Sequence, residues 1–422
     1  MKRTARDNRP ALRPVKKIEV PEKHLLLRII LFVVLLVFGA SALIYGLSGL
    51  FAKQSGWQRV TTESKGAADC GDEFELQYEF GKSDVSVRAE SNQLTRLYSE
   101  ASVTAYQLFH ETQEFDGVCN VAYLNAHPNQ SVEVDPVLYH ALESLSTADT
   151  RQPYLAPLYD YYNNLFLCTE DYETQDYDPA QNKELAALFA EILDYANDPD
   201  AIDLELEGNN KVCLRVSDAY LQFAGETEIY TFYSFHWMKN AFIADYLAST
   251  LIENGYTHGT LSSFDGFYRD LDDRGTLYSL NLFDRVENTI CLVGAMNYTE
   301  PLSIVSLRTF PVNPADNPRY YVLENKEVRF PYLDPSDGLC RAGESNLVCY
   351  SDSAGCAEIL LRMLPVYIAD SFDPMPLVKD PKIDVLFCRD QTIWHSAESL
   401  DVTSALPAKE EYVCKQLPDS ND

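Results

Sequence analysis

Aspartates beside glycine turns are the side chains of this sequence best suited to chemistry. Ser263-Phe-Asp-Gly266 and Tyr332-Leu-Asp-Pro-Ser-Asp-Gly338 both place carboxylates at a tight turn. A carboxylate can accept or donate a proton, so Asp265 and Asp337 are candidates for a general acid or base. Aspartate is also common in turns because its side chain hydrogen-bonds the nearby backbone. A purely structural role is therefore the alternative for both residues.

Other familiar catalytic patterns are missing from the sequence. The seven histidines show no ligand spacing such as H-x-x-x-H, which argues against a histidine metal site. No G-x-S-x-G elbow, P-loop or G-x-G-x-x-G motif occurs. The sequence thus gives no support to a hydrolase nucleophile or to these nucleotide-binding loops.

A helix and a strand must position the first turn. Residues 245–252 carry apolar side chains at a period of 3.6 residues, and Asn254-Gly255 ends the predicted helix as a C-cap does. Residues 260–264 read as a strand, which Asp265-Gly266 then turns. The second segment, 332–338, reads as a strand that enters a tight turn.

The remaining chain from Phe74 onward mixes helical and strand patterns, which favours an α+β fold. Helices are predicted over 91–111, from Asp135-Pro136 through Leu145, and over 180–195. Residues 201–206 and 211–216 flank Glu207-Gly-Asn-Asn210 and predict a hairpin.

In order and spacing, these segments resemble the FAD:protein FMN transferase (ApbE) family. The family pattern runs lysine-glycine-aromatic-x-x-aspartate, a helix, asparagine-x-glycine-glycine, then histidine-histidine-x-x-aspartate-proline-x-threonine-glycine. A closing helix carries an aspartate and, four residues later, a threonine. The matching positions here are Phe242, Asp245, Gly266, Arg269, Asp334, Pro335, Gly338 and Ala357-Glu358, with upstream similarity at Asn125, 132–143 and Pro157-Leu158.

The resemblance covers residues 74 to about 370 and implies an ApbE-like, T-fold-related domain. It further implies FAD as the flavin donor, Mg²⁺ as the metal, and a threonine of a membrane or surface flavoprotein as the FMN acceptor. The catalytic candidates are then Asp337 and Asp265, and Glu358 is the metal candidate because Mg²⁺ prefers hard oxygen ligands. The implied cofactor-binding residues are Asp245, Ser263, Gly266, Asp334 and Gly338.

Several polar residues of the family pattern are replaced. Asn240 stands for the lysine, with Lys239 one place early, and Phe330-Pro331 stands for the paired histidines. Arg362 stands for the threonine of the closing helix, where a cation would compete with magnesium at Glu358. The other replacements are Asp265-Gly266 for the glycine pair, Asp337 for the turn threonine and Thr150-Arg151-Gln152 for the upstream alanine-phenylalanine-aspartate.

Two functions follow from this mixture of matches and replacements. One is a divergent FMN transferase with a rebuilt site. The other is a catalytically degenerate ApbE-fold protein that binds a ligand or acts as a scaffold. Pairing of Arg362 with Glu358 would argue against magnesium and so distinguish them. The aromatic segment 230–237 fits a flavin stack or, alternatively, the core beside the 245–252 helix.

An apolar segment, 25–51, is long enough to cross a bilayer as a helix of about 20 residues. The basic segment 1–24 before it predicts a cytoplasmic N-terminus by the positive-inside rule. A cleaved signal peptide ending near Ala40-Ser-Ala42 is the alternative, but the apolar run continues past it. The predicted organisation is a basic cytoplasmic tail at 1–24, a transmembrane helix at 25–51, a stalk at 52–73 and an extracytoplasmic domain at 74–422, held at the cell membrane.

Charge is divided sharply along the chain. Residues 1–28 hold nine basic and three acidic side chains, so the remainder carries a formal charge of −36. Such an acidic exterior repels nucleic acid and anionic lipid, so no nucleic-acid partner is expected. The densest acidic stretch, 170–178, lacks the glycine and spacing of a calcium loop and is predicted to be a solvated loop.

Ten cysteines are scattered without a C-x-x-C pair, which excludes zinc-ribbon and thioredoxin-type sites. Cys340 could form a disulfide with Cys349 or Cys356. Cys168, Cys213 and Cys291 lie in apolar runs and fit buried thiols instead.

Overall fold

The computed structural model describes residues 30–39, 55–63, 70–313, 318–404 and 412–418. The chain divides into two units, Met1–Gln54 and Ser55–Asp422. In the first unit, residues 30–39 are helical and their side chains are exposed. No helix in the described ranges is long and apolar enough to cross a membrane. The predicted tail at 1–24 and the rest of the predicted anchor, 25–29 and 40–51, lie outside these ranges.

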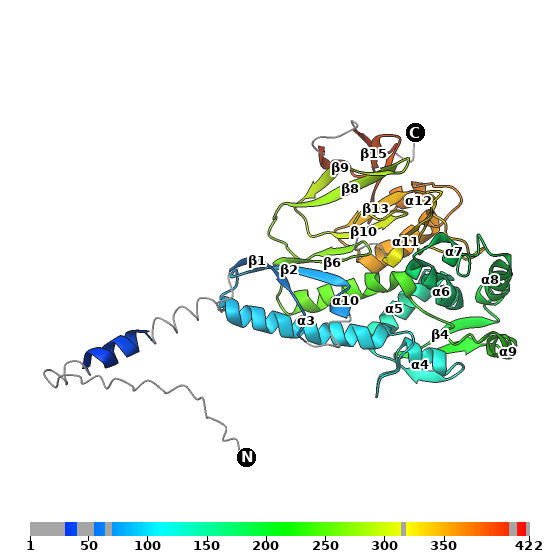
Figure 1. The fold of residues 1–422 in the computed structure, drawn as a ribbon, viewed down its shortest axis with the longest axis horizontal. Helices are drawn as coiled ribbons and strands as arrows, with labels where there is room; N and C mark the ends of the chain where they lie inside the picture. Colours follow the sequence, from blue (N-terminus) through cyan, green and yellow to red (C-terminus); the bar gives the residue numbers. More distant parts are fainter. Residues whose placement is uncertain (1–29, 40–54, 64–69, 314–317, 405–411, 419–422) are drawn as a thin grey trace, which may run out of the picture. The chain divides into compact units, whose positions relative to one another are not determined.

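The second unit is built on a nine-stranded sheet with the strand order β1-β2-β6-β7-β10-β13-β14-β15-β17 (Figure 1). All neighbours are antiparallel except the parallel pair β15 and β17. The strands are β1 Gly56–Val60, β2 Phe74–Phe80, β6 Gly259–Ser263, β7 Phe267–Asp270, β10 Ser303–Arg308, β13 Asn346–Ser351, β14 Asp384–Arg389, β15 Thr392–His395 and β17 Val413–Gln416.

Three smaller sheets accompany the large one. They are formed by β3 Ser131–Glu133, β5 Lys211–Val216 and β4 Ile202–Gly208; by β16 Asp401–Ser404, β9 Thr289–Tyr298 and β8 Tyr278–Val286; and by β11 Tyr321–Val322 with β12 Val328–Arg329. The antiparallel pair β4 and β5 confirms the predicted hairpin.

Three long helices pack against the large sheet. The helix α3 (Val87–Phe109) contacts β1 and β2, α10 (Lys239–Glu253) contacts α3, β6 and β7, and α11 (Cys356–Tyr367) contacts α10, β10 and β13. Figure 1 shows α3 and α10 side by side across one end of the sheet. The other helical segments are α4 Val121–Ala126, α5 Pro136–Thr147, η1 Gln152–Leu155, α6 Ala156–Tyr162, η2 Asn163–Leu167, α7 Asp171–Thr174, α8 Lys183–Ala196, α9 Asp218–Thr227, η3 His236–Met238 and α12 Met375–Val378.

Local sequence signals account for these helix boundaries. Asn254 is the C-cap of α10, and Gly255 follows with a φ of +83°. Asp135 caps α5 by accepting a hydrogen bond from the Val137 N–H, and proline occupies the first helical position. The predicted α+β class and the helix over 245–252 are confirmed.

Aromatic residues fill much of the core beneath α10. Phe232, Tyr233 and Phe235 are each at most 5% exposed. The rings of Phe235 and Phe242 lie with their centroids 5.1 Å apart, edge to face. Most of the 230–237 segment therefore packs in the core, as one of the two interpretations expected.

The folded unit starts earlier in the chain than predicted. Residues 56–60, which fall inside the predicted stalk, form β1 and pair with β2 over the whole length of β1. The strand is short and only Val60 is buried in it, so its sequence lacks the alternation that marks a strand.

The acidic stretch 170–178 is ordered, in contrast to the predicted solvated loop. Glu170 and Glu173 form a capping box at α7, and Thr174 and Asp178 are buried. An ion pair to Arg329, whose Nε lies 2.7 Å from Asp178 Oδ2, compensates the buried charge.

All ten cysteines are free thiols in the structure. Cys340 pairs with neither Cys349 nor Cys356, and Cys349 and Cys356 are fully buried. Cys213 is likewise buried, as the buried-thiol interpretation expected, whereas Cys168 and Cys291 are half-buried.

Candidate functional site

A polar cluster surrounds the start of α10. The side chain of Asn240 is buried and donates from Nδ2 to Glu73 Oε2 at 2.7 Å and to Asp265 Oδ2 at 2.8 Å. The neighbouring Lys239 places Nζ 3.2 Å from Glu73 Oε1. Two carboxylates from different loops thus meet at the position where the family pattern has its lysine.

Strand pairing brings these two carboxylates together. β2 and β6 run antiparallel with Phe74 opposite Ser263. Glu73 precedes β2 and Asp265 follows β6, so both lie at the same end of the sheet. The N–H of Phe264 donates to the carbonyl of Glu73 at 3.3 Å, which closes this end of the pairing.

Asp265 occupies an electrostatically mixed environment. Burial raises the pKa of its carboxyl above the usual value, although Arg319, with Nη2 3.8 Å from Asp265 Oδ2, opposes that shift. Within the described part of the chain, Oδ1 of Asp265 and Oδ1 of Asn240 have no hydrogen-bond partner and are shielded from solvent. The cluster therefore keeps unused acceptor capacity.

A cavity of about 400 Å³ opens beside this cluster. It lies between the end of α3 and the start of α10. Its charged and polar lining includes Glu73, Glu111, His236, Lys239 and Asn240, and Tyr106 and Trp237 contribute aromatic surface. A volume of this size fits a small organic molecule.

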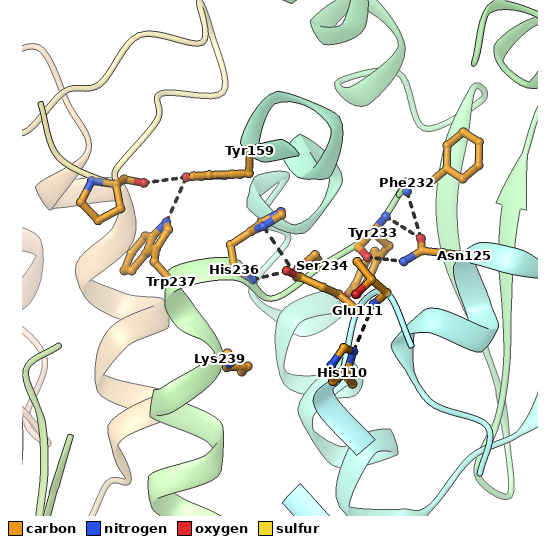
Figure 2. Close-up of polar contacts among 12 residues, drawn as sticks. His110, Glu111, Asn125, Tyr159, Phe232, Tyr233, Ser234, His236, Trp237 and Lys239 are labelled. Atoms are coloured by element: carbon orange, nitrogen blue, oxygen red, sulfur yellow. Dashed lines mark hydrogen bonds and ion pairs between the residues drawn. The ribbon is translucent and has the colours of Figure 1, made fainter. Parts of the chain in front are cut away.

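His236 lines the cavity, and contacts with its neighbours hold it in place (Figure 2). Its ring stacks on Tyr159 with centroids 4.1 Å apart, and its backbone N–H donates to Ser234 Oγ at 3.0 Å. The Ser234 hydroxyl in turn donates to Glu111, whose Oε2 lies 4.0 Å from His236 Nδ1. Burial lowers the pKa of His236 to about 4, so the ring is neutral at pH 7.

This arrangement is not a nucleophile–base pair. The Ser234 hydroxyl donates to a carboxylate and not to the imidazole, so His236 is not placed to take its proton. Nε2 of His236 is buried without a partner among the described residues. We therefore assign His236 and Glu111 to the cavity wall, with Ser234 linking them from behind it.

Hydrogen bonds also fix the frame around the cavity (Figure 2). The hydroxyl of Tyr159 accepts from Trp237 Nε1 at 3.0 Å and donates to the carbonyl of Pro331 at 2.9 Å. Asn125 accepts from the N–H groups of Phe232 and Tyr233, both at 2.9 Å. Tyr159 thereby ties the start of α10 to the 330–338 segment.

Phe330 and Pro331 serve packing where the family pattern has paired histidines. Phe330 is 8% exposed, and its carbonyl accepts from the Tyr162 hydroxyl at 3.1 Å. Neither side chain can carry a proton. A small cavity of about 20 Å³ is lined by Asp265 together with Pro331 and Tyr332, so the two sequence segments do meet.

Asp245 is committed to holding two elements together. Its Oδ1 accepts from the Cys356 N–H and its Oδ2 from the Ala357 N–H, both at 2.8 Å. Arg269 Nη1 also lies 2.7 Å from Oδ1. The residue thus caps the N-terminus of α11 from a position on α10.

Ser263 and Gly266 form the turn between β6 and β7. The hydroxyl of Ser263 accepts from the Phe267 N–H at 3.0 Å. Gly266 has a φ of +104°, and a Cβ at this position would lie 2.1 Å from the carbonyl oxygen of Ser306. Only glycine fits this contact with β10.

Asp334 and Asp337 share one cation, Arg341, which forms an ion pair with each. Asp334 Oδ1 also accepts from the Ser336 N–H at 2.7 Å, and Asp337 Oδ1 accepts from the Leu339 N–H at 3.0 Å. Both are Asx-type turn contacts. Gly338 completes the turn with a φ of +71°.

Glu358 lies between two cations. Arg362 Nη2 is 2.7 Å and Lys382 Nζ is 3.0 Å from its Oε1, and Arg362 also pairs with Asp380. Burial opposes ionisation, but Lys382 and Arg362 hold the pKa of Glu358 below its ordinary value. Both cations contact the same oxygen, so a metal ion at Glu358 would have to bind next to two positive charges. Within the described ranges, no three His, Cys, Asp or Glu side chains are arranged to hold a metal ion.

Comparison with known proteins identifies the fold. The structure aligns with the ApbE protein from Thermotoga maritima at a TM-score of 0.52 and 13% identity, covering 83% of this chain and 97% of that chain. It aligns with the flavin transferase ApbE from Vibrio cholerae at a TM-score of 0.52 and 9% identity, covering 84% and 98%. The chain has an ApbE-like fold. No protein-family model and no curated protein matches it by sequence.

The ApbE-like fold confirms the resemblance predicted from the sequence. The agreement lies in the three-dimensional structure, because the sequence identity is low. The sequence identified Asp265 and the position of Asn240, which meet in the structure. It did not identify Glu73, Glu111, His236 or Arg319 as site residues. Glu73 joins the cluster through strand pairing and Glu111 through the end of α3, so neither carries a local motif.

Proposed function

We propose that this chain is a membrane-anchored, extracytoplasmic ApbE-fold protein that binds a ligand in the cavity between α3 and α10 and does not transfer FMN. The ApbE-like fold supports the flavin-related origin, and the apolar segment 25–51 supports the anchor. FAD is the first ligand to test.

The main observation against FMN transfer is that Glu358 is already paired with two cations. Transfer of FMN from FAD needs a divalent cation to neutralise the phosphates. At Glu358 the cations are instead Arg362 and Lys382. An ammonium and a guanidinium satisfy this carboxylate and would repel Mg²⁺.

The other matched acids agree with this interpretation. Asp245 caps α11 and pairs with Arg269, and Asp334 and Asp337 are neutralised by Arg341. None of them presents a free carboxylate to the cavity. These contacts stabilise the fold, which explains the presence of the acidic residues without a catalytic role.

A divergent FMN transferase remains the second candidate, and one observation favours it. Asp265 retains an unpaired oxygen beside Asn240, which would supply a proton acceptor if the buried turn opened to substrate. Its acceptor would be a threonine of a membrane or surface flavoprotein.

An assay for covalent flavin distinguishes the two candidates. The full chain is incubated with FAD, Mg²⁺ and a protein that carries a flavinylation threonine, and the denaturing gel is read for flavin fluorescence. We expect no fluorescent band. A band that Glu358→Gln abolishes would establish transfer and overturn the proposal.

Ligand binding needs its own measurement. Quenching of FAD fluorescence on titration with the chain would show binding without turnover, and Lys239→Met should weaken it because Lys239 lines the cavity. Lys326→Met, a substitution in the exposed turn between β11 and β12, is the matched control. If FAD does not bind and no other small molecule does, only the scaffold role is left.

A further inference from the structure

Three exposed apolar side chains surround the point at which the chain enters the folded unit. Trp57 on β1 is 45% exposed, Val85 in the loop before α3 is 49% exposed, and Leu277 before β8 is 67% exposed. Apolar side chains scattered singly on a surface need no explanation, but a group of them marks an interaction site.

Contacts of neighbouring residues place these three side chains near the same end of the sheet, and Leu277 also lines the rim of a cavity with Thr299 and Glu300. The ring of Trp57 packs edge to face on Tyr278, the residue after Leu277, with centroids 6.2 Å apart. A Cβ placed on Gly81 would lie 2.9 Å from Cβ of Ser55, so the loop that carries Val85 starts against the first residue of the unit. We call Trp57, Val85 and Leu277 the entry patch.

The entry patch lies at a free edge of the large sheet. β1 is the outermost strand and pairs only with β2 among the described strands. Figure 1 shows β1 and the start of α3 together at this end of the sheet. No described element covers the patch, since all three side chains are exposed.

Chain length determines what can lie next to this patch. The apolar segment ends at Phe51, five residues before β1 begins at Gly56. Five residues span at most about 18 Å when fully extended, which is less than the diameter of a small domain. If residues 25–51 cross the bilayer, β1 must stay close to the membrane surface.

We propose that the entry patch contacts the headgroup region of the membrane that holds the anchor. This inference rests on the membrane anchoring in the proposed function. Tryptophan favours the membrane–water interface because its ring is apolar and its N–H is polar. Leu277 and Val85 add apolar surface. Exposed side chains of both signs, Lys82, Asp84 and Arg88, flank Val85 on the loop and on α3, and Lys82 Nζ lies 3.2 Å from Glu79 Oε1.

The net charge of the chain indicates which kind of lipid headgroup the patch can contact. The chain after residue 28 carries −36, so an anionic surface would repel most of the folded unit. The patch is therefore suited to a zwitterionic lipid such as phosphatidylcholine, with contact driven by apolar side chains. Contact should weaken as anionic lipid is added.

Fluorescence quenching tests the contact directly. The full chain is reconstituted in phosphatidylcholine vesicles whose acyl chains carry bromine either near the headgroup or near the bilayer centre. The difference in emission between the wild type and Trp57→Phe isolates the signal of Trp57 from those of Trp237 and Trp394. We expect the shallow bromine to quench this signal at least about twofold more than the deep one.

Two variants make the result specific. Leu277→Gln should reduce the shallow quenching of Trp57 by about half, because it removes neighbouring apolar surface. Leu167→Gln, at a side chain that is 75% exposed on η2, should leave it unchanged.

Each other outcome has a distinct meaning. If the chain floats with the vesicles but Trp57 is quenched by iodide and not by bromolipid, the patch is free in water and this inference is overturned. If Trp57 is shielded from both, a protein surface covers it, and the lipid contact is equally overturned. If the chain does not float with vesicles at all, the anchoring in the proposed function fails first.

Discussion

The carboxylate of Asp245 lies directly against the α-carbon of Gly355. A Cβ built on Gly355 would be 2.5 Å from Oδ2 of Asp245. The glycine therefore gives Asp245 the room to cap α11, whose N-cap residue has no side chain to do so.

Replacement of Gly355 by alanine should destabilise the protein by about 2–4 kcal/mol, since it adds a clash and displaces a cap. Urea unfolding followed by circular dichroism measures this. Gly225→Ala is the control, because a Cβ at this helical position in α9 meets nothing within 4 Å. That control should be neutral or stabilising by about 0.5–1 kcal/mol. Equal effects of the two substitutions would contradict the capping role.

Gly266→Ala should be more severe, costing about 3–5 kcal/mol or preventing folding. The substitution combines a φ of +104° with a Cβ 2.1 Å from the Ser306 carbonyl oxygen. Gly117→Ala isolates the backbone strain, because Gly117 has a φ of +75° with no atom near its Cβ. Thermal unfolding of both variants gives the comparison, and a similar loss at the two sites would show that the contact with β10 is unimportant.

Asp270 should make stability depend on pH. Burial raises the pKa of its carboxyl to about 7, and Oδ2 has no partner among the described residues. Between pH 4 and pH 7 the folded state keeps this proton, whereas the carboxyl of the unfolded state, with a pKa of 3.8, has already lost it. The free energy of unfolding should fall by about 2–4 kcal/mol as the pH rises from 4 to 7 and stay lower above that.

Asp270→Asn is the test of this pH dependence, because an amide cannot ionise. Denaturant unfolding of both proteins between pH 4 and pH 8 should show the fall in the wild type and a smaller one in the variant. Parallel curves would mean that Asp270 is not the group responsible.

His236 should remain neutral well below its ordinary titration range. Its pKa is lowered to about 4 by burial, against 6.5 for a free imidazole. As the pH falls from 6.5 towards 4, the imidazole of the unfolded state takes up a proton that the folded state does not bind. The free energy of unfolding therefore decreases over this range. Imidazole NMR shifts should show no change for His236 above pH 5. Titration of His236 near 6.5 would show that the ring is hydrated.

Local signals explain what the sequence could predict. The end of α10 at Asn254 and the Asp265-Gly266 turn depend on residues adjacent in the chain, and both were predicted. The resemblance to ApbE proteins added the order of elements, and the fold agrees with it. The Glu358 and Arg362 pair was anticipated because residues four apart share a helix face.

Long-range contacts explain what the sequence could not predict. Glu73 reaches Asn240 across 167 positions through the pairing of β2 with β6. Lys382 reaches Glu358 from the loop after α12, with no signal in either segment. The short strand β1 has no strand pattern of its own, since its position depends on pairing with β2, and the sequence therefore predicts a stalk there.

The hydroxyl of Tyr159 joins Trp237, before α10, to Pro331, at the start of the second turn segment. One buried oxygen thus bridges two pieces of chain that are almost a hundred residues apart. Because both partners are held by the same atom, Trp237 and Pro331 cannot separate without breaking a hydrogen bond in the core. The Trp237 side of the cavity is thereby fixed before a ligand enters, so little conformational entropy is lost on that side when the ligand binds.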